Sequence, residues 1–99
     1  MTPYQRLKKY NTKGNLWVYI LAVLKDGPEY AWLLPDIIEK RFNFRPGKIT
    51  PYRVLYDLEE EELVHSKLED RKRMYAITAK GEKELKKVKS FYNEIINNL

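Results

Sequence analysis

The side chains best suited to chemistry are basic and aromatic residues gathered in two short segments, residues 48–56 and 67–73. The first segment combines cations, a hydroxyl and phenols: Lys48, Thr50, Tyr52, Arg53 and Tyr56. The second supplies further cations: Lys67, Arg71, Lys72 and Arg73. Such groups donate hydrogen bonds to phosphate oxygens, and an arginine can also form two parallel hydrogen bonds with guanine. The two segments therefore indicate a surface that binds DNA.

No group of residues has the composition or the spacing of a catalytic centre. The absence of cysteine excludes disulfides and thiolate metal sites. His65 has no second histidine or cysteine to complete a metal site or a catalytic pair, so we interpret it as a structural or surface residue. The consecutive carboxylates of residues 59–62 would fan around a helix instead of converging on a cation. We therefore expect a protein that is not an enzyme and that uses neither metal nor cofactor.

Length and composition indicate one small globular domain. The 99 residues suffice for one modest core, and 43% hydrophobic with 33% charged residues is too apolar for intrinsic disorder. The longest apolar stretch, residues 16–24, is about half of the ~20 residues that a membrane-spanning helix needs. With no signal-peptide pattern and no cysteine, we expect a cytoplasmic protein. The net charge of +5 favours a polyanionic partner.

Two candidate helical segments precede the Asp-Gly-Pro at residues 26–28. Residues 3–10 form either a short helix that Thr2 caps or a loose basic arm. Residues 16–25 repeat apolar side chains at helical spacing, with Asn15 in a favourable N-cap position. Asp-Gly-Pro at residues 26–28 ends this helix, because glycine suits a left-handed cap and proline cannot continue the helix.

Two more helices follow. Residues 31–42 fit a helix if Pro35 falls in its first turn, where few backbone hydrogen bonds are lost. Residues 48–62 predict the third helix. Its buried stripe has the spacing i, i+3, i+4, i+7, and consists of Pro51, Val54, Leu55 and Leu58. The basic and aromatic residues named above lie on the opposite face.

The periodicity then changes from helical to alternating. Residues 64–68 and 72–77 predict two strands that residues 69–71 join, with Arg71, Lys72 and Arg73 at or near the hairpin tip. Thr78 caps a last helix over residues 79–98. Its apolar residues repeat with coiled-coil spacing: Leu85, Val88, Tyr92, Ile95 and Leu99. This seam could fold back on its own domain, but on so small a core we expect a dimer contact.

Three helices followed by a hairpin are typical of a winged helix, so we predict a mainly α fold with a small β-hairpin. Residues 1–78 would form the DNA-binding domain and residues 79–99 the dimerisation helix. The third helix, about 48–62, would enter the major groove, and the hairpin or wing, about 64–77, would lie along the sugar–phosphate backbone.

Four segments resemble the PadR family of transcriptional regulators, in its short form with a single C-terminal helix. Residues 16–21 (LWVYIL) look like the family's first helix, and residues 27–32 (GPEYAW) are similar to its Gly-Pro-x-Tyr-Gly-Tyr motif. Residues 46–59 (PGKITPYRVLYDLE) resemble the recognition segment. Residues 73–81 (RMYAITAKG) resemble the end of the wing and the start of the last helix. The sequence departs from the usual family residues at four positions: Ala31, Trp32, Thr50 and Asp57.

The resemblance implies a homodimeric repressor that binds double-stranded DNA through its winged helix. It also implies a small aromatic or hydrophobic effector, although no residue set in the sequence identifies one. Two other functions stay open: a nucleoid-type protein that coats DNA without sequence preference, and a winged-helix module that docks proteins. The aromatic residues, Trp17 and Trp32 among them, could line an effector pocket, but aromatic residues at helical spacing more often belong to the core.

Overall fold

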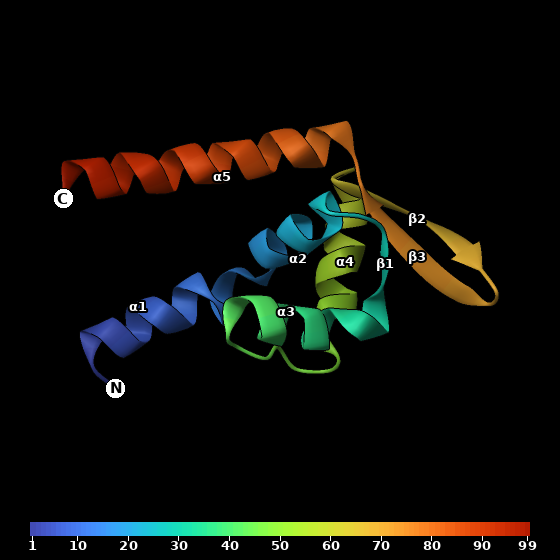
Figure 1. The fold of residues 1–99 in the computed structure, drawn as a ribbon, viewed down its shortest axis with the longest axis horizontal. Coiled ribbons are helices and arrows are strands. Elements are labelled where there is room, and N and C mark those ends of the chain that lie inside the picture. Colours follow the sequence, from blue (N-terminus) through green and yellow to red (C-terminus); the bar gives the residue numbers. More distant parts are fainter.

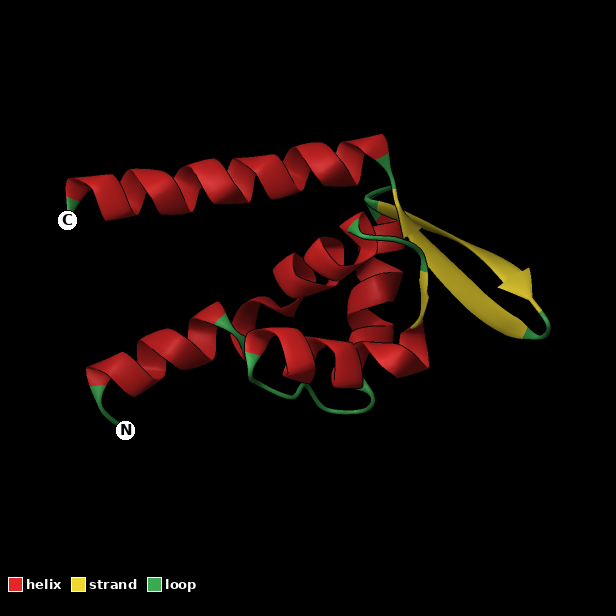
Figure 2. Ribbon diagram, in the orientation of Figure 1, coloured by secondary structure: helices red, strands yellow, loops and turns green.

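The computed structural model describes residues 1–99 and consists mainly of helices with one small antiparallel sheet (Figures 1 and 2). The predicted fold class, a winged helix with a further C-terminal helix, is confirmed. In chain order the elements are α1 (Pro3–Asn11), α2 (Leu16–Lys25), β1 (Glu29–Tyr30), α3 (Leu34–Phe42), α4 (Thr50–Glu60), β2 (Val64–Glu69), β3 (Lys72–Ile77) and α5 (Ala79–Asn98). Single 3-10 turns precede α2 (Lys13–Asn15) and α3 (Ala31–Leu33).

The N-terminal segment is a helix. Thr2 and Gln5 form a capping box, in which the Gln5 amide donates to Thr2 Oγ1 at 3.1 Å and the Thr2 amide donates to Gln5 Oε1 at 2.9 Å. Asn15 occupies the predicted N-cap position of α2, but the expected capping hydrogen bond from its side chain is absent. Its side chain donates backward to the Tyr10 carbonyl at 2.6 Å and makes no cap hydrogen bond to α2. Asn15 thus ties α1 to α2 through the intervening 3-10 turn.

The third predicted helix is shorter than expected at both ends. In a helix that began at Lys48, the fourth residue would donate the first backbone hydrogen bond, and Pro51 has no N–H to donate. Helix α4 instead begins at Thr50, so that Pro51 lies in its first turn and Lys48 precedes the helix. At the other end Glu62 takes a left-handed conformation with φ of 64°, and the Leu63 amide donates to the Leu58 carbonyl at 2.9 Å. This closure ends the helix at Glu60, in the manner of a Schellman motif.

The wing is part of a three-stranded sheet in the order β1-β3-β2, where a two-stranded hairpin was expected. Strands β2 and β3 pair in the register Val64↔Ile77 to Glu69↔Lys72. Asp70 and Arg71 both have positive φ, 48° and 67°, so they form the tight turn that matches the twist of a hairpin. The third strand, β1, adds the pairs Glu29↔Tyr75 and Tyr30↔Met74 and ties the wing to the chain before α3.

The core lies where α2 meets α3, α4, the root of the wing and the first turns of α5. Ile20, Leu21, Leu34, Ile38 and Leu55 are fully buried there. Outside this core the molecule extends in two opposite directions along its 47 Å axis (Figure 1). The wing projects at one end, and α1 with the C-terminal part of α5 projects at the other. No helix has both the length and the hydropathy to cross a membrane.

Candidate nucleic-acid interface

Helix α4 is held by one face and leaves the other free. Pro51, Leu55 and Leu58 are buried against the domain, so the residues between them must point outward. The exposed residues are the polar and aromatic ones expected from the sequence: Thr50, Tyr52, Arg53 and Tyr56. Lys48 is also exposed, in the bend before the helix. The structure therefore brings the predicted residues of the first segment together on one surface.

Two arginines near this surface differ in what they contact. Arg45 donates to Asp36 at 2.6 Å and to Glu39 at 3.2 Å, and the Asp36 hydrogen bond raises its pKa. Arg53 takes part in none of the ion pairs of the chain, which join other residues. The charge of Arg45 is thus engaged within the chain, whereas the guanidinium of Arg53 keeps its donors for a ligand.

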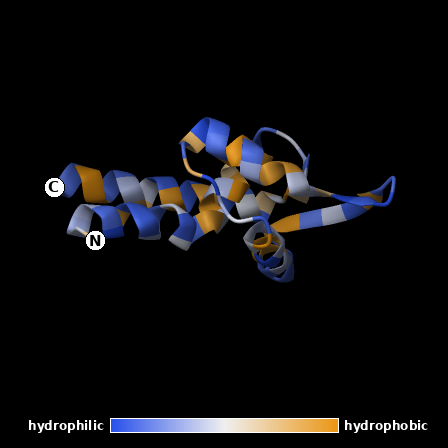
Figure 3. Ribbon diagram, turned by 90° about the horizontal axis from the view of Figure 1, so that it is seen from below, coloured by the Kyte–Doolittle hydropathy of each residue, from blue (hydrophilic) through white to orange (hydrophobic).

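The wing carries its four predicted cations on exposed positions. Arg71 lies in the turn at the tip, which is hydrophilic in Figure 3. Lys67 is 3.5 Å from Glu69 in a solvent-exposed pair, which costs little to open. Lys72 lies over the ring of Trp32, with Nζ 5.3 Å from the ring centroid. Arg73 donates to Ser66 Oγ at 3.2 Å.

Glu59 links α4 to the wing, a contact that the sequence pattern did not predict. Its Oε2 accepts from the Ser66 amide at 3.0 Å and from Ser66 Oγ at 2.8 Å. With the Arg73 contact to Ser66, a chain of hydrogen bonds runs from α4 to β3. Burial raises the pKa of Tyr75 beside it, and the charge of Glu59 raises it further. The sequence indicated only that the carboxylates of residues 59–62 do not converge on a cation, whereas one of them joins α4 to the wing.

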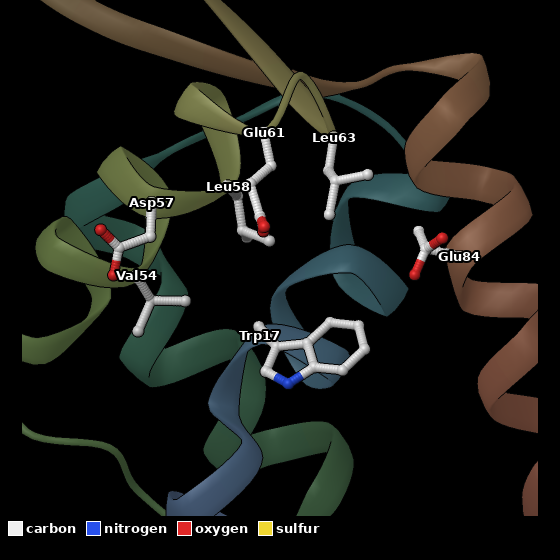
Figure 4. A pocket seen from close by; sticks show the side chains of 7 residues that line it. All are labelled: Trp17, Val54, Asp57, Leu58, Glu61, Leu63 and Glu84. Atoms are coloured by element: carbon white, nitrogen blue, oxygen red, sulfur yellow. The ribbon is translucent and has the colours of Figure 1, made fainter.

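The two tryptophans do not share a pocket. Trp17 lines a hollow of about 290 Å³ between α2, α4 and α5, whereas Trp32 lies on the surface between α3 and the wing. Figure 4 shows the Trp17 ring below the hollow, with Asp57 on one side and Glu84 on the other. Glu61 also lines it. These carboxylates would repel an anionic aromatic compound and attract a cationic one.

The predicted dimer seam divides into a buried and an open part. Leu85 is 4% exposed and belongs to the core of its own chain, so it is not available to a partner. Val88 and Tyr92 are half-buried, and Tyr92 Oη contacts Asn11 Oδ1 of α1 at 3.3 Å. Ile95 is 41% exposed and Leu99, beyond the end of the helix, is 98% exposed.

Helix α1 adds to this open surface, which the sequence pattern of α5 alone could not reveal. Leu7 of α1 and Phe91, Ile95 and Ile96 of α5 line a groove of about 400 Å³ between the two helices. Tyr19 forms its floor, and its hydroxyl donates to the Asn11 carbonyl. Burial raises the pKa of Tyr19. We call the four apolar side chains that line this groove the arm surface: Leu7, Phe91, Ile95 and Ile96.

Comparisons with known proteins agree with this architecture. The sequence matches the transcriptional regulator PadR-like family over residues 20–87. A PadR-like transcriptional regulator from Bacillus cereus is similar in structure, with a TM-score of 0.77 and 21% identity, covering 92% of this chain and 91% of its own. A PadR family transcriptional regulator from Eggerthella lenta has a TM-score of 0.81 and 19% identity, covering 96% and 85%. F93 from STIV, described as a winged-helix DNA-binding protein, has a TM-score of 0.72 and 19% identity, covering 86% and 94%. No curated protein matches the sequence.

Proposed function

The chain belongs to the PadR-like family of transcriptional regulators, as its motifs predicted, and on this premise we propose that it is a homodimer that binds particular sites on double-stranded DNA. Residues 1–78 form the DNA-binding domain and residues 79–99 the dimerisation helix. The description of F93 from STIV as a DNA-binding protein with this fold supports the proposal. Because a bound dimer would exclude other proteins from its site, we propose repression as the effect on transcription.

The observation that carries the proposal is the unpaired guanidinium of Arg53 on the open face of α4. A guanidinium has five N–H donors and can donate two parallel hydrogen bonds to O6 and N7 of guanine in the major groove. The hydroxyls of Thr50 and Tyr56 lie on the same surface. A mixture of donors of this kind favours the reading of base edges, whereas lysines alone would bind any duplex.

The wing supplies the contacts that position this helix. Lys67, Arg71, Lys72 and Arg73 lie on the wing and not on the helix that would enter the groove, so they suit the sugar–phosphate backbone. Lys48 would contact phosphate just before α4 begins. The hydrogen bonds that Ser66 donates to Glu59 join helix and wing, so that both can meet the same duplex.

The arm surface supports dimerisation. Apolar side chains from two helices lie open to water at the end opposite the wing, where a second copy could cover them. Two recognition helices placed one DNA turn apart read a near-palindrome. A small aromatic or hydrophobic effector would find space in the hollow beside Trp17, with a preference for a cationic compound.

Selection from random duplex DNA tests the proposal, followed by titration of the enriched duplex and a scrambled one at several salt concentrations. We expect a near-palindrome that is bound about 1,000-fold more tightly than scrambled DNA. Tight binding without sequence preference would replace the proposal with a nucleoid-type function. Absence of binding to any duplex would favour a protein-docking module.

A further inference from the structure

Trp32 is a large aromatic side chain that the fold leaves in water. It is 54% exposed, in the 3-10 turn that follows β1. Exposed tryptophan is uncommon on a surface that binds nothing, because its ring carries a large apolar area. Neither the recognition helix nor the wing contains Trp32, so the functional assignment above gives it no role.

Two hollows flank this ring. One, of about 320 Å³, lies toward the wing and includes Lys72, Arg73 and Tyr75 in its lining. The other, of about 200 Å³, lies toward the start of α4 and includes Lys48 in its lining. Trp32 and Tyr52 line both hollows. The two rings therefore separate the hollows, and we call them the Trp32–Tyr52 ridge. Each hollow carries at least one cation that takes part in none of the ion pairs of the chain.

The ridge also organises one of these cations. Lys72 Nζ lies 5.3 Å from the centroid of the Trp32 ring, within the range of a cation–π interaction. A lysine side chain on a strand near a hairpin tip is otherwise free to take many conformations. The contact with the indole favours a conformation in which the ammonium lies beside the first hollow, which Lys72 also lines.

We propose that the Trp32–Tyr52 ridge seats the sugar–phosphate backbone of one DNA strand, a site that rests on the proposed function and adds a contact outside helix and wing. A deoxyribose packs against the indole, and the phosphates on either side enter the two hollows. Lys72 and Arg73 bind one phosphate and Lys48 binds the other. Arg45 also lines the second hollow, but Asp36 and Glu39 already hold its charge.

The lining explains why the ligand is backbone and not a base edge. Neither hollow includes a carboxylate to accept from cytosine or an amide side chain to pair with adenine. The arginines of the two hollows, which could bind guanine, already donate within the chain: Arg73 to Ser66, and Arg45 to Asp36 and Glu39. Cations, phenols and an indole instead match phosphates and a sugar. The contact should therefore raise affinity for every duplex alike.

Affinity measurements with Trp32→Ala and Trp32→Tyr test this assignment. We expect Trp32→Ala to weaken binding about five- to tenfold for both the enriched and the scrambled duplex, and Trp32→Tyr to restore most of the loss. Circular dichroism on heating checks that the variants remain folded. A loss confined to the enriched duplex would assign Trp32 to base reading and overturn the proposal, as would wild-type affinity in Trp32→Ala.

Intrinsic fluorescence gives a second, direct measurement, because the chain has only two tryptophans. In Trp17→Phe, where Trp32 alone emits, duplex DNA should change the intensity or the wavelength of emission. In the matched variant Trp32→Phe, where Trp17 alone emits, it should change neither. If the protein binds no duplex, the proposed function fails; if it binds and the Trp32 emission stays constant, only the ridge assignment fails.

Discussion

The two ends of the molecule both expose aromatic or apolar side chains, but the residues next to these side chains differ between the ends. At the wing end, Trp32 and Tyr52 are interleaved with Lys48 and Lys72, and a cation lies directly over a ring. At the arm end, the exposed side chains of Phe91, Ile95 and Ile96 are continuous with Leu7 of α1, and Lys8 is the only cation that lines the groove. Rings among cations suit a polyanion with sugar faces, whereas a continuous apolar surface suits a second protein chain.

Three hydrogen bonds join the start of α5 to the segment that follows α4. Thr78 Oγ1 donates to the Glu62 carbonyl at 2.7 Å, and the Thr78 amide donates to the Leu63 carbonyl at 3.1 Å. Lys80 Nζ donates to the Glu61 carbonyl at 2.9 Å. The first turn of α5 is thus fastened to the end of α4, so the helix that carries most of the arm surface is joined directly to the helix that carries Arg53.

Gly81→Ala should have the largest effect, because it breaks this junction. A Cβ at Gly81 would lie 2.1 Å from the Leu63 carbonyl oxygen and 2.8 Å from Ile77 Cγ1. We expect the free energy of unfolding to fall by about 3 kcal/mol, measured by urea denaturation. The matched control is Gly47→Ala, whose Cβ would meet only Thr50 Oγ1 at 3.7 Å. Equal stability of the two variants would show that the junction is not tightly packed.

Ile95→Asp should weaken the dimer through the arm surface. A carboxylate on the arm surface would be buried without a partner in the dimer, which should raise the dimer dissociation constant about 100-fold. Sedimentation velocity measures the change. Asn93→Asp, which adds the same charge at an exposed position of α5, should leave the dimer intact. An unchanged dimer in Ile95→Asp would refute the arm surface as the interface.

Arg53→Ala should reduce sequence preference without removing binding. Loss of two parallel hydrogen bonds to guanine should reduce the discrimination between enriched and scrambled duplex by about 2 kcal/mol. Competition titration measures this ratio. Arg41→Ala removes an arginine that pairs with Asp26 away from the wing, and should preserve the ratio. If Arg53→Ala keeps full discrimination, α4 does not read bases through this residue.

Lys72→Ala should give the smallest and most uniform effect. Loss of one phosphate contact should weaken binding to all duplexes alike and reduce the slope of log affinity against log salt by about one unit. Arg73→Ala should reduce the slope similarly, and should also loosen the contact to Ser66. A change in sequence preference in either variant would place the wing in a groove instead of on the backbone.

Most of the fold could be predicted because its signals are local. Helix α2 and helix α5 follow from apolar periodicity, and Thr2 and Thr78 mark helix starts through their own side chains. Strand β1 could not be predicted, since two residues have no periodicity and pair only because β3 lies beside them. The ends of α4 shifted because proline geometry and a left-handed Glu62 outweigh apolar spacing.

The residue types of the candidate site could be predicted from the sequence, whereas most of its contacts could not. The exposed donors of α4 follow from the buried stripe opposite them, because burial of one face dictates the other. The roles of Glu59, Trp32 and Leu7 depend on which elements pack together: Glu59 meets Ser66 of the wing, Trp32 meets Lys72, and Leu7 meets α5. Leu85 was assigned to the dimer seam because its spacing is the same whether its helix faces its own core or a partner.

Stoichiometry on the enriched duplex tests most directly whether one surface binds DNA while the other joins two chains. Sedimentation of labelled duplex, titrated with wild-type protein and with Ile95→Asp, would count the chains in each complex. We predict that the wild-type protein forms a complex of two chains on one near-palindrome, with no one-chain complex at any ratio, and that Ile95→Asp binds only weakly as single chains. A one-chain complex of full affinity and full sequence preference would contradict the assignment of the arm surface to dimerisation for DNA binding.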